Sequence, residues 1–350
     1  MRRALLFFGA LVICISSFAQ TIRRVTNLPV SSPGINVYTT VNDAIAASSN
    51  GDMIYIEPST VAYAGFTVNK TLNFIGNGNF LDQNPDTPFE KNVSYINQNV
   101  YFEAGSNNST ITGLYFEDNL ILTGTNGVQI RRNRLNGGFA LNANTSGILI
   151  AENYFGGSVA GLANNGTSAQ NTVLRNNIVS FGEIRFLKNS VIQNNTVIYN
   201  FTNSIIRDNE NCVISNNIFD RRTYNAIYNV SGENGGSTVL NNLQIVSASA
   251  PLPSPNPDAN NNLYTSNFNN VFVVNYPWNA NPVKDSNFKL LAGSPAAGIG
   301  IGGTDAGAFG GAFPYTLSTL PNIPIITSAI TSTTGTNTVP IDVTISVRSN

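Results

Sequence analysis

Val128-Gln-Ile-Arg-Arg-Asn133-Arg-Leu135 is a phrase that this 350-residue chain repeats, each time with an Asn in the same position. The other four copies are Ile148-Leu-Ile-Ala-Glu-Asn153-Tyr-Phe155, Thr172-Val-Leu-Arg-Asn-Asn177-Ile-Val179, Ser190-Val-Ile-Gln-Asn-Asn195-Thr-Val197 and Cys212-Val-Ile-Ser-Asn-Asn217-Ile-Phe219. Successive Asn residues lie 20, 24, 18 and 22 positions apart. A period near 20 predicts a solenoid with one turn per repeat, whereas a propeller blade needs about twice that length.

Residues within each phrase alternate, as the residues of a half-buried strand do. One apolar column lies three positions before the Asn and comprises Ile130, Ile150, Leu174, Ile192 and Ile214. A second lies two positions after it and comprises Leu135, Phe155, Val179, Val197 and Phe219. We expect both columns to point inward and the strands of successive turns to pair in parallel at about 4.8 Å.

The Asn column itself predicts an interior ladder. Its members are Asn133, Asn153, Asn177, Asn195, Asn217 and, in a copy shortened by one residue, Asn242. Amide bonds between equivalent Asn residues of adjacent turns would satisfy polar groups that a sharp bend otherwise leaves buried and unpaired. The slot just before the ladder holds Arg132, Glu152, Asn176, Asn194 and Asn216. Because that slot accepts charged residues, we expect it to face water.

The N-terminus has the pattern of a secretory signal peptide over residues 1–19. Arg2 and Arg3 precede an apolar run, and Ser17-Phe-Ala19 forms a small-x-small cleavage site. The apolar run is short for a bilayer span, so we expect an exported protein, secreted or at the cell surface, with no membrane span after cleavage. Cleavage would leave Cys212 as the single cysteine, a small buried hydrophobe that can form no intrachain disulfide.

The amino-acid composition excludes several classes of binding partner and of catalytic site. Charged residues make up 11% of the chain and its formal net charge is -1, which gives no electrostatic footprint for nucleic acid. The chain contains no His, which excludes His-based triads and zinc sites that need imidazole. We expect a monomer whose Asn-, Ser- and Thr-rich surface binds neutral polar partners by hydrogen bonds.

On these phrases the chain resembles the pectate-lyase-like right-handed parallel β-helix superfamily. The opening, Tyr38-Thr-Thr-Val41-Asn-Asp-Ala-Ile45 and then Gly51-Asp52-Met-Ile-Tyr-Ile56, is also similar. Thr40 can cap a short helix there, with Asp43 in the capping-box position, and the helix would close the end of the stack. Asn287-Phe-Lys-Leu-Leu-Ala-Gly-Ser-Pro295 and Thr304-Asp-Ala-Gly-Ala-Phe-Gly-Gly311 resemble the last turn of many secreted bacterial β-helix proteins.

The resulting expectation is an all-β, right-handed parallel β-helix of roughly 9–10 turns with an N-terminal capping helix. Residues 20–37 would form a lead-in and residues 38–315 the β-helix. Residues 316–350 would form a C-terminal β tail, with strands at about 323–330 and 340–347, which packs on the helix or leads to a further module.

The resemblance implies carbohydrate-active chemistry, which the motifs restrict. The chain lacks the Asp-Asp pair and His-Gly of polygalacturonases, the Gly-Arg-Pro-Trp of pectin esterases and the Asp-Pro-His of alginate-type epimerases. A polysaccharide lyase that uses calcium and an Arg or Lys base remains. Calcium needs clustered oxygen ligands, and the base needs a lowered pKa. Nothing in the sequence requires a cofactor otherwise.

One stretch combines the charges that such a lyase needs. The candidate residues are Glu183, Arg185, Lys188, Arg207, Asp208 and Glu210. Arg185 and Arg207 both lie ten positions before the ladder Asn of their turn, and Lys188 and Glu210 both lie seven before it. Each pair should therefore stack on adjacent turns. Two stacked arginines need an anion between them, which Glu183 or Asp208 could supply internally or a uronate carboxylate from outside. The alternative is a solvated patch of ion pairs worth little energy.

Three functions follow from these observations. The first is a secreted or cell-surface protein that binds a polysaccharide or other surface glycan, without necessary catalysis. The second is a calcium-assisted lyase of uronate polysaccharides that acts near residues 183–210. The third is a structural or adhesive module of the cell envelope.

Overall fold

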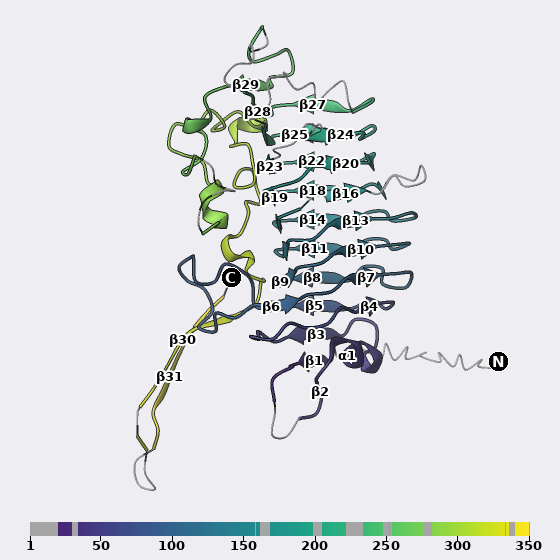
Figure 1. The fold of residues 1–350 in the computed structure, drawn as a ribbon, viewed down its shortest axis with the longest axis vertical. Helices are drawn as coiled ribbons and strands as arrows, with labels where there is room; N and C mark the ends of the chain where they lie inside the picture. The colour runs from purple at the N-terminus through teal and green to yellow at the C-terminus, as the bar shows by residue number, and fades with distance from the viewer. Residues whose placement is uncertain are drawn as a thin grey trace, which may run out of the picture.

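The computed structural model describes residues 20–29, 34–157, 159–161, 169–198, 205–221, 234–247, 252, 254–275, 277, 280, 282–332, 334–335 and 340–349. These residues form a parallel β-solenoid of about nine turns, with three sheets along the stack (Figure 1). The expectation of an all-β parallel coil is confirmed. The expected signal peptide, residues 1–19, lies outside the described residues. No described helix has the length and apolar character needed to cross a membrane.

Three sheets, here called A, B and C, form the walls of the solenoid. Sheet A comprises, in spatial order, β2 (Val37–Tyr38), β1 (Ile22–Val25), β3 (Met53–Ile56), β5 (Asn73–Ile75), β8 (Thr110–Thr112), β11 (Gln129–Arg131), β14 (Leu149–Ala151), β18 (Val173–Arg175), β22 (Val191–Gln193), β25 (Val213–Ser215) and β27 (Thr238–Leu240). Sheet B comprises β6 (Ser94–Ile96), β9 (Leu114–Phe116), β12 (Arg134–Leu135), β15 (Tyr154–Phe155), β19 (Ile178–Val179), β23 (Thr196–Ile198), β26 (Ile218–Asp220), β28 (Leu243–Ile245) and β29 (Leu263–Thr265). Sheet C comprises β4 (Thr67–Val68), β7 (Val100–Phe102), β10 (Leu120–Leu122), β13 (Phe139–Leu141), β16 (Val159–Gly161), β20 (Ile184–Arg185) and β24 (Ile206–Arg207). A further parallel pair joins β17 (Ala169–Gln170) to β21 (Leu187–Lys188).

The apolar columns fill the interior as expected. Ile130 pairs with Ile150 in register, and that column continues through Leu174, Ile192 and Ile214 on successive strands. All of these side chains are fully buried, as is Cys212. A register error of one residue would turn each column out to solvent, so the alternation in the sequence determines which face of each strand is buried.

The Asn ladder lies at the corner between sheets A and B. Asn133 Nδ2 donates to Asn153 Oδ1 at 3.1 Å, and Asn153 Nδ2 donates to Asn177 Oδ1 at 3.0 Å. The same bond then links Asn177 to Asn195, Asn195 to Asn217, Asn217 to Asn242 and Asn242 to Asn262. Each of these Asn residues is buried. Asn262 is the member that the repeated phrase did not reveal.

The slot just before the ladder does not face water, contrary to expectation. Glu152, Asn176, Asn194 and Asn216 are all buried. Residues in this slot have positive φ, for example 53° at Asn176, which Asn tolerates better than most residues. Their side chains bond a later part of the chain: Asn176 Nδ2 donates to the carbonyl of Gly310 at 2.8 Å. The burial therefore comes from a contact between segments far apart in the sequence.

That later part, residues 268–324 and here called the return segment, runs back along the stack beside sheet B (Figure 1). Its short 3₁₀ helices are η1 (Phe268–Asn270), η3 (Asp285–Phe288), η4 (Ile301–Gly303) and η5 (Leu317–Thr319). Phe272 and Phe288 pack with the outward residues Tyr154, Ile218 and Leu243 of sheet B. Residues 287–311 do not form the expected last turn. They cover the outer face of sheet B, whose strands β23 and β26 are buried on both sides.

The ends of the expected β-helix also differ from the structure. The lead-in contributes β1, which pairs with β3 in sheet A, so the stack begins before residue 38. Helix α1 (Val41–Ala47) follows β2, and its first turn is capped by Thr40, whose Oγ1 accepts from Asp43 N at 3.1 Å. Among the described residues the last strand of the stack is β29 (Leu263–Thr265), so the described stack ends well before residue 315.

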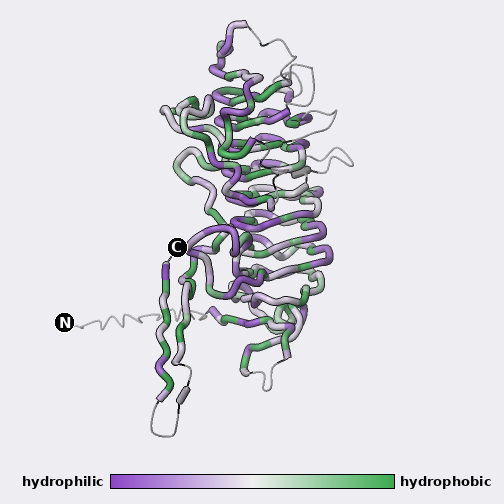
Figure 2. The backbone as a smooth tube through the Cα atoms, turned by 60° about the vertical axis from the view of Figure 1, so that its left-hand side comes forward, coloured by the Kyte–Doolittle hydropathy of each residue, from purple (hydrophilic) through white to green (hydrophobic). Residues whose placement is uncertain are grey.

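The C-terminal tail forms an antiparallel hairpin of β30 (Ile325–Thr331) and β31 (Val343–Arg348). Figures 1 and 2 show it standing away from the stack, with hydrophobic and hydrophilic residues interspersed along it. Its base contacts the loop before sheet B: Phe89 N donates to the carbonyl of Ile326 at 2.8 Å, and Arg348 pairs with Asp86 at 3.0 Å.

We predict that Asn195→Ala lowers the free energy of unfolding by about 3 kcal/mol or more, because it leaves several buried partners unpaired. Asn195 accepts from the backbone and the side chain of Asn177 and donates to Asn217. The control, Asn142→Ala, removes one exposed bond to Thr123, and we expect it to cost about 0.5 kcal/mol or less. Urea unfolding followed by circular dichroism measures both, and equal losses would contradict the role of the ladder.

Asp285 anchors the return segment from a fully buried position. Its carboxylate accepts from Asn84 Nδ2 at 2.8 Å, from Ser318 N at 2.6 Å and from the Tyr315 hydroxyl at 3.3 Å. Burial raises the pKa of this carboxyl although these bonds act in the opposite direction. The stability that Asp285 contributes through its titration is therefore present below the unfolded pKa of about 3.9 and is lost as the pH rises through the folded pKa.

We predict that the difference in unfolding free energy between the wild type and Asp285→Asn falls as the pH rises from about 3.5 toward neutrality. The variant has no carboxyl to titrate at this position, so the difference isolates Asp285 from the other acids. Urea titrations at a series of pH values measure it. A difference that stays constant or grows with pH would contradict the assigned direction.

Candidate functional site

The two candidate arginines lie side by side on the outer face of sheet C. Arg185 ends β20, Arg207 ends β24, and the two residues pair directly in register. Ile184 and Ile206, which precede them, are buried in the core, so the alternation of the strand directs both arginines outward. The stacking predicted from their equal distance to the ladder Asn is confirmed.

Glu183 supplies the anion between these arginines. Its carboxylate lies 2.8 Å from Arg185 Nη1 and 3.0 Å from Arg207 Nε, and its side chain is only 6% exposed. Burial alone would lower the pKa of Arg207, but the hydrogen bond and charge of Glu183, with those of Asp208, raise it. Of the two expected sources of this anion, an internal carboxylate or a uronate from outside, the structure contains the internal carboxylate.

Phe186 and Asp208 also contact the two arginines. The Phe186 ring lies 5.2 Å from the Arg185 guanidinium carbon and 5.7 Å from that of Arg207, and Asp208 forms an ion pair with Arg207. A ring face attracts a guanidinium through its quadrupole. Arg207 therefore has two carboxylates and an aromatic ring around it, which restrict its rotation and its availability to a ligand.

The second predicted stack pairs Lys188 with Glu210. The two residues form an isolated parallel bridge, and their charged groups lie 2.9 Å apart. Their side chains are 34% and 52% exposed. Exposed ion pairs of this kind contribute little to stability. This pair therefore matches the alternative interpretation, a solvated patch of ion pairs without a catalytic role.

The six candidate residues together carry three positive and three negative charges, which cancel. Each of the three bases is already paired with an acid, so none is free to take a proton from a substrate. Across the described part of the chain, no group of three or more His, Cys, Asp or Glu side chains converges as a metal site would require.

A pocket that the sequence did not indicate lies at the other end of sheet C. It is a shallow, open depression of about 460 Å³ between β4 and the turns before β7 and β10, and Thr67, Gln98, Asn99, Tyr101 and Asp118 line it. Its lining is mostly uncharged and polar. Its aromatic residues, Phe66 and Tyr101, and its amides can offer a stacking surface and hydrogen bonds to a polar ligand.

An external row of amides supports this pocket. Asn99 Nδ2 donates to the Tyr101 hydroxyl at 3.1 Å, and Asn99 Oδ1 accepts from Asn119 Nδ2 at 3.0 Å. Asn119 Oδ1 in turn accepts from Gly138 N. Asn99 and Asn119 are 20 positions apart, each directly before an inward strand residue. That spacing is the signal that could have revealed this second row.

Comparisons with protein-family models, with curated proteins and with solved structures found no match for this chain.

We predict that Glu183→Gln lowers the free energy of unfolding by about 2–4 kcal/mol, because it leaves two arginines facing each other without their shared anion. Glu210→Gln is the matched control, because it removes the same charge from an exposed pair and should cost about 1 kcal/mol or less. Thermal and urea unfolding measure both variants. A Glu183→Gln protein as stable as Glu210→Gln would show that the arginine pair needs no internal anion.

Proposed function

We propose that this protein binds a polysaccharide along the outer face of sheet C. The observation that carries the proposal is the pocket around Tyr101, which combines an aromatic ring with amide and carboxylate groups. A sugar presents apolar C–H faces that can stack on such a ring, and hydroxyls that can donate and accept hydrogen bonds.

The pocket retains polar groups that a ligand could use. Gln98 uses its side-chain oxygen to accept from Gly65 N. Within the described ranges, neither its amide nitrogen nor the Asp118 carboxylate forms a hydrogen bond or an ion pair. Asp118 is exposed and can accept from two sugar hydroxyls, while Gln98 can donate. These groups and the Tyr101 ring support recognition of a neutral sugar.

The face beyond the pocket is suited to an extended chain. From Tyr101 the row continues in register through Ile121 and Ala140, then β16, to Arg185 and Arg207. Strand spacing of about 4.8 Å places Arg185 about 19 Å from Tyr101, a length that accommodates several sugar units. The row thus joins the pocket to the ion-paired cluster on a single face.

We further infer export by the signal peptide of residues 1–19, a right-handed coil of the pectate-lyase-like type, a capping role for α1 and a monomeric state. The repeated phrases, the capping-box opening and the position of α1 against β1 and β3 support these inferences.

The remaining two functions have less support. A calcium-assisted lyase would need one of the three bases released from its ion pair and additional carboxylates near it. A structural or adhesive envelope module needs no pocket at all. The glycan-binding proposal is the one that uses the polar groups around Tyr101.

We predict binding to at least one glycan on an array, and at least about tenfold weaker binding after Tyr101→Ala, because the stacking surface is lost. Tyr101→Phe keeps the ring and should retain most of the affinity. Tyr264→Ala, at the far end of the stack, is the control for loss of a tyrosine elsewhere.

Two results would contradict this proposal. Absence of binding to every glycan would favour the structural module, and full binding by Tyr101→Ala would place the ligand elsewhere. In parallel, ultraviolet absorbance with uronate polymers and added calcium tests the lyase, since its unsaturated product absorbs.

A further inference from the structure

A second polar surface lies on the outer face of sheet A, away from the surface proposed for sugars. Arg131 on β11, Ala151 on β14 and Arg175 on β18 occupy one row in register. The two arginines are therefore two strands apart, about 9.6 Å between their Cα atoms. Ala151 points outward between them and is nevertheless fully buried, so neighbouring side chains close over it.

Positive charge exceeds negative charge at this row. Glu152 is buried, and its carboxylate binds Arg131 Nη2 at 2.8 Å and Arg132 Nε at 2.7 Å. It also accepts from Thr316 Oγ1 at 2.9 Å. Within the part of the chain that the structure describes, Arg175 pairs with no carboxylate. Arg131 and Arg132 thus share one carboxylate, and with Arg175 beside them the local charge is +2.

Both arginines of the row keep unused donors. Arg131 Nε and Arg175 Nη1 are buried and have no hydrogen-bond partner among the described atoms. Buried donors are normally paired, so unpaired ones call for an explanation such as an absent ligand. Burial, and after it the charge of Arg131, lowers the pKa of Arg175, although the charge of Glu152 acts in the opposite direction.

Arg175 is held in place although it has no ion-pair partner. Its guanidinium carbon lies 4.4 Å from the ring centre of Phe313, which belongs to the return segment and is 59% exposed. Stacking on a ring orients the plane of a guanidinium and leaves its edge free for a planar or tetrahedral oxyanion. The cation is therefore preorganised for a ligand.

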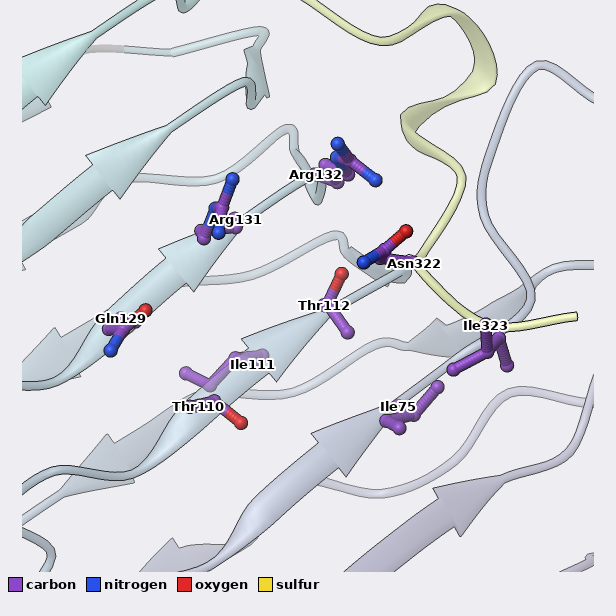
Figure 3. Close-up of a pocket in the computed structure, with 9 residues that line it drawn as sticks. All are labelled: Ile75, Thr110, Ile111, Thr112, Gln129, Arg131, Arg132, Asn322 and Ile323. Atoms are coloured by element: carbon purple, nitrogen blue, oxygen red, sulfur yellow. The ribbon is translucent and has the colours of Figure 1, made fainter. Parts of the chain in front are cut away.

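A pocket adjoins the row on its N-terminal side. It has a volume of about 220 Å³, and its polar lining comprises Thr110, Thr112, Gln129, Arg131, Arg132 and Asn322 (Figure 3). Figure 3 shows Arg131 and Asn322 on two sides of it, one from sheet A and one from the return segment. Hydroxyl and amide groups beside a cationic pair suit a ligand that is polar throughout and charged at one end.

We propose that the outer face of sheet A between Thr112 and Arg175 binds an oxyanion-bearing ligand. Its carboxylate, sulfate or phosphate group lies against Arg131 and Arg175, and its uncharged polar part occupies the pocket beside Gln129 and Asn322. The anion supplies the counter-charge that Arg175 lacks and accepts from the unpaired donors of both arginines. This site uses a different sheet from the proposed sugar surface and does not depend on it.

The test measures the binding of inorganic sulfate, inorganic phosphate and glucuronate by isothermal titration calorimetry at constant ionic strength, with glucose as the uncharged match for glucuronate. We expect binding of at least one anion and none of glucose at this row. The strongest of the three identifies which oxyanion geometry the row prefers. Failure of all three to bind would overturn the proposal.

Arg175→Gln should weaken that binding about tenfold or more, because it removes the cation without breaking an internal ion pair. Arg348→Gln, which removes an exposed arginine from the hairpin, is the matched control and should bind like the wild type. Equal binding by the two variants would overturn the proposal. Circular dichroism establishes that each variant is folded.

Phe313→Ala provides a second variant if Arg175→Gln does not fold. It leaves every charge in place and removes only the ring that orients Arg175, so we expect anion binding to weaken several-fold. Unchanged binding by this variant would overturn the stacking argument. Tyr101→Ala tests whether the two surfaces are independent. Loss of glycan binding with retained anion binding would show that the two ligands bind to different sheets.

Discussion

One buried hydrogen bond, repeated from turn to turn, is the constraint on which this structure depends: the amide of a ladder Asn donates to the side-chain oxygen of the next. The chain bends sharply between sheets A and B, and a bend inside a core leaves backbone groups without partners. Each ladder Asn also donates to a backbone carbonyl of the preceding turn, as Asn195 does to Leu174. The side chain therefore replaces the backbone bonds that the bend removes, and it aligns neighbouring turns in register.

This alignment explains why turns of unequal length stack in the same way. Linked Asn residues are between 18 and 25 positions apart, so up to seven residues must be absorbed elsewhere in the turn. The corner between sheets A and B keeps two residues, one with positive φ and one in the ladder. Loops at the other corners vary. Chemistry and ligand contact can change at those corners without disturbing the core, as loops on a rigid scaffold commonly permit.

The outer faces of the three sheets have different environments for physical reasons. The outer face of sheet B carries apolar residues such as Tyr154, Ile218 and Leu243, which the return segment covers, and the same segment buries the corner slot. Sheets A and C keep exposed outer faces, and each carries an arginine cluster built around a buried acid. On sheet C, Glu183 balances Arg185 and Arg207 together with Asp208. On sheet A, Glu152 is shared by Arg131 and Arg132, and Arg175 remains without an acid among the described residues. One arginine more and one carboxylate fewer make the cluster on sheet A positive, whereas the charges of the cluster on sheet C cancel.

The sequence by itself determined the repeat, the inward columns, the Asn ladder through Asn242 and the stacking of Arg185 on Arg207. All of these follow from the periodicity, because residues at equal distances from the ladder must lie on adjacent strands. Only the tertiary structure decided the course of the return segment, the burial of Glu152, the place of Glu183 between two arginines, the pocket at Tyr101 and the stacking of Arg175 on Phe313. The return segment follows no period, and its contacts join residues as far apart as Asn84 and Ser318. Which side chains meet across such separations depends on packing in three dimensions, which local pattern does not encode.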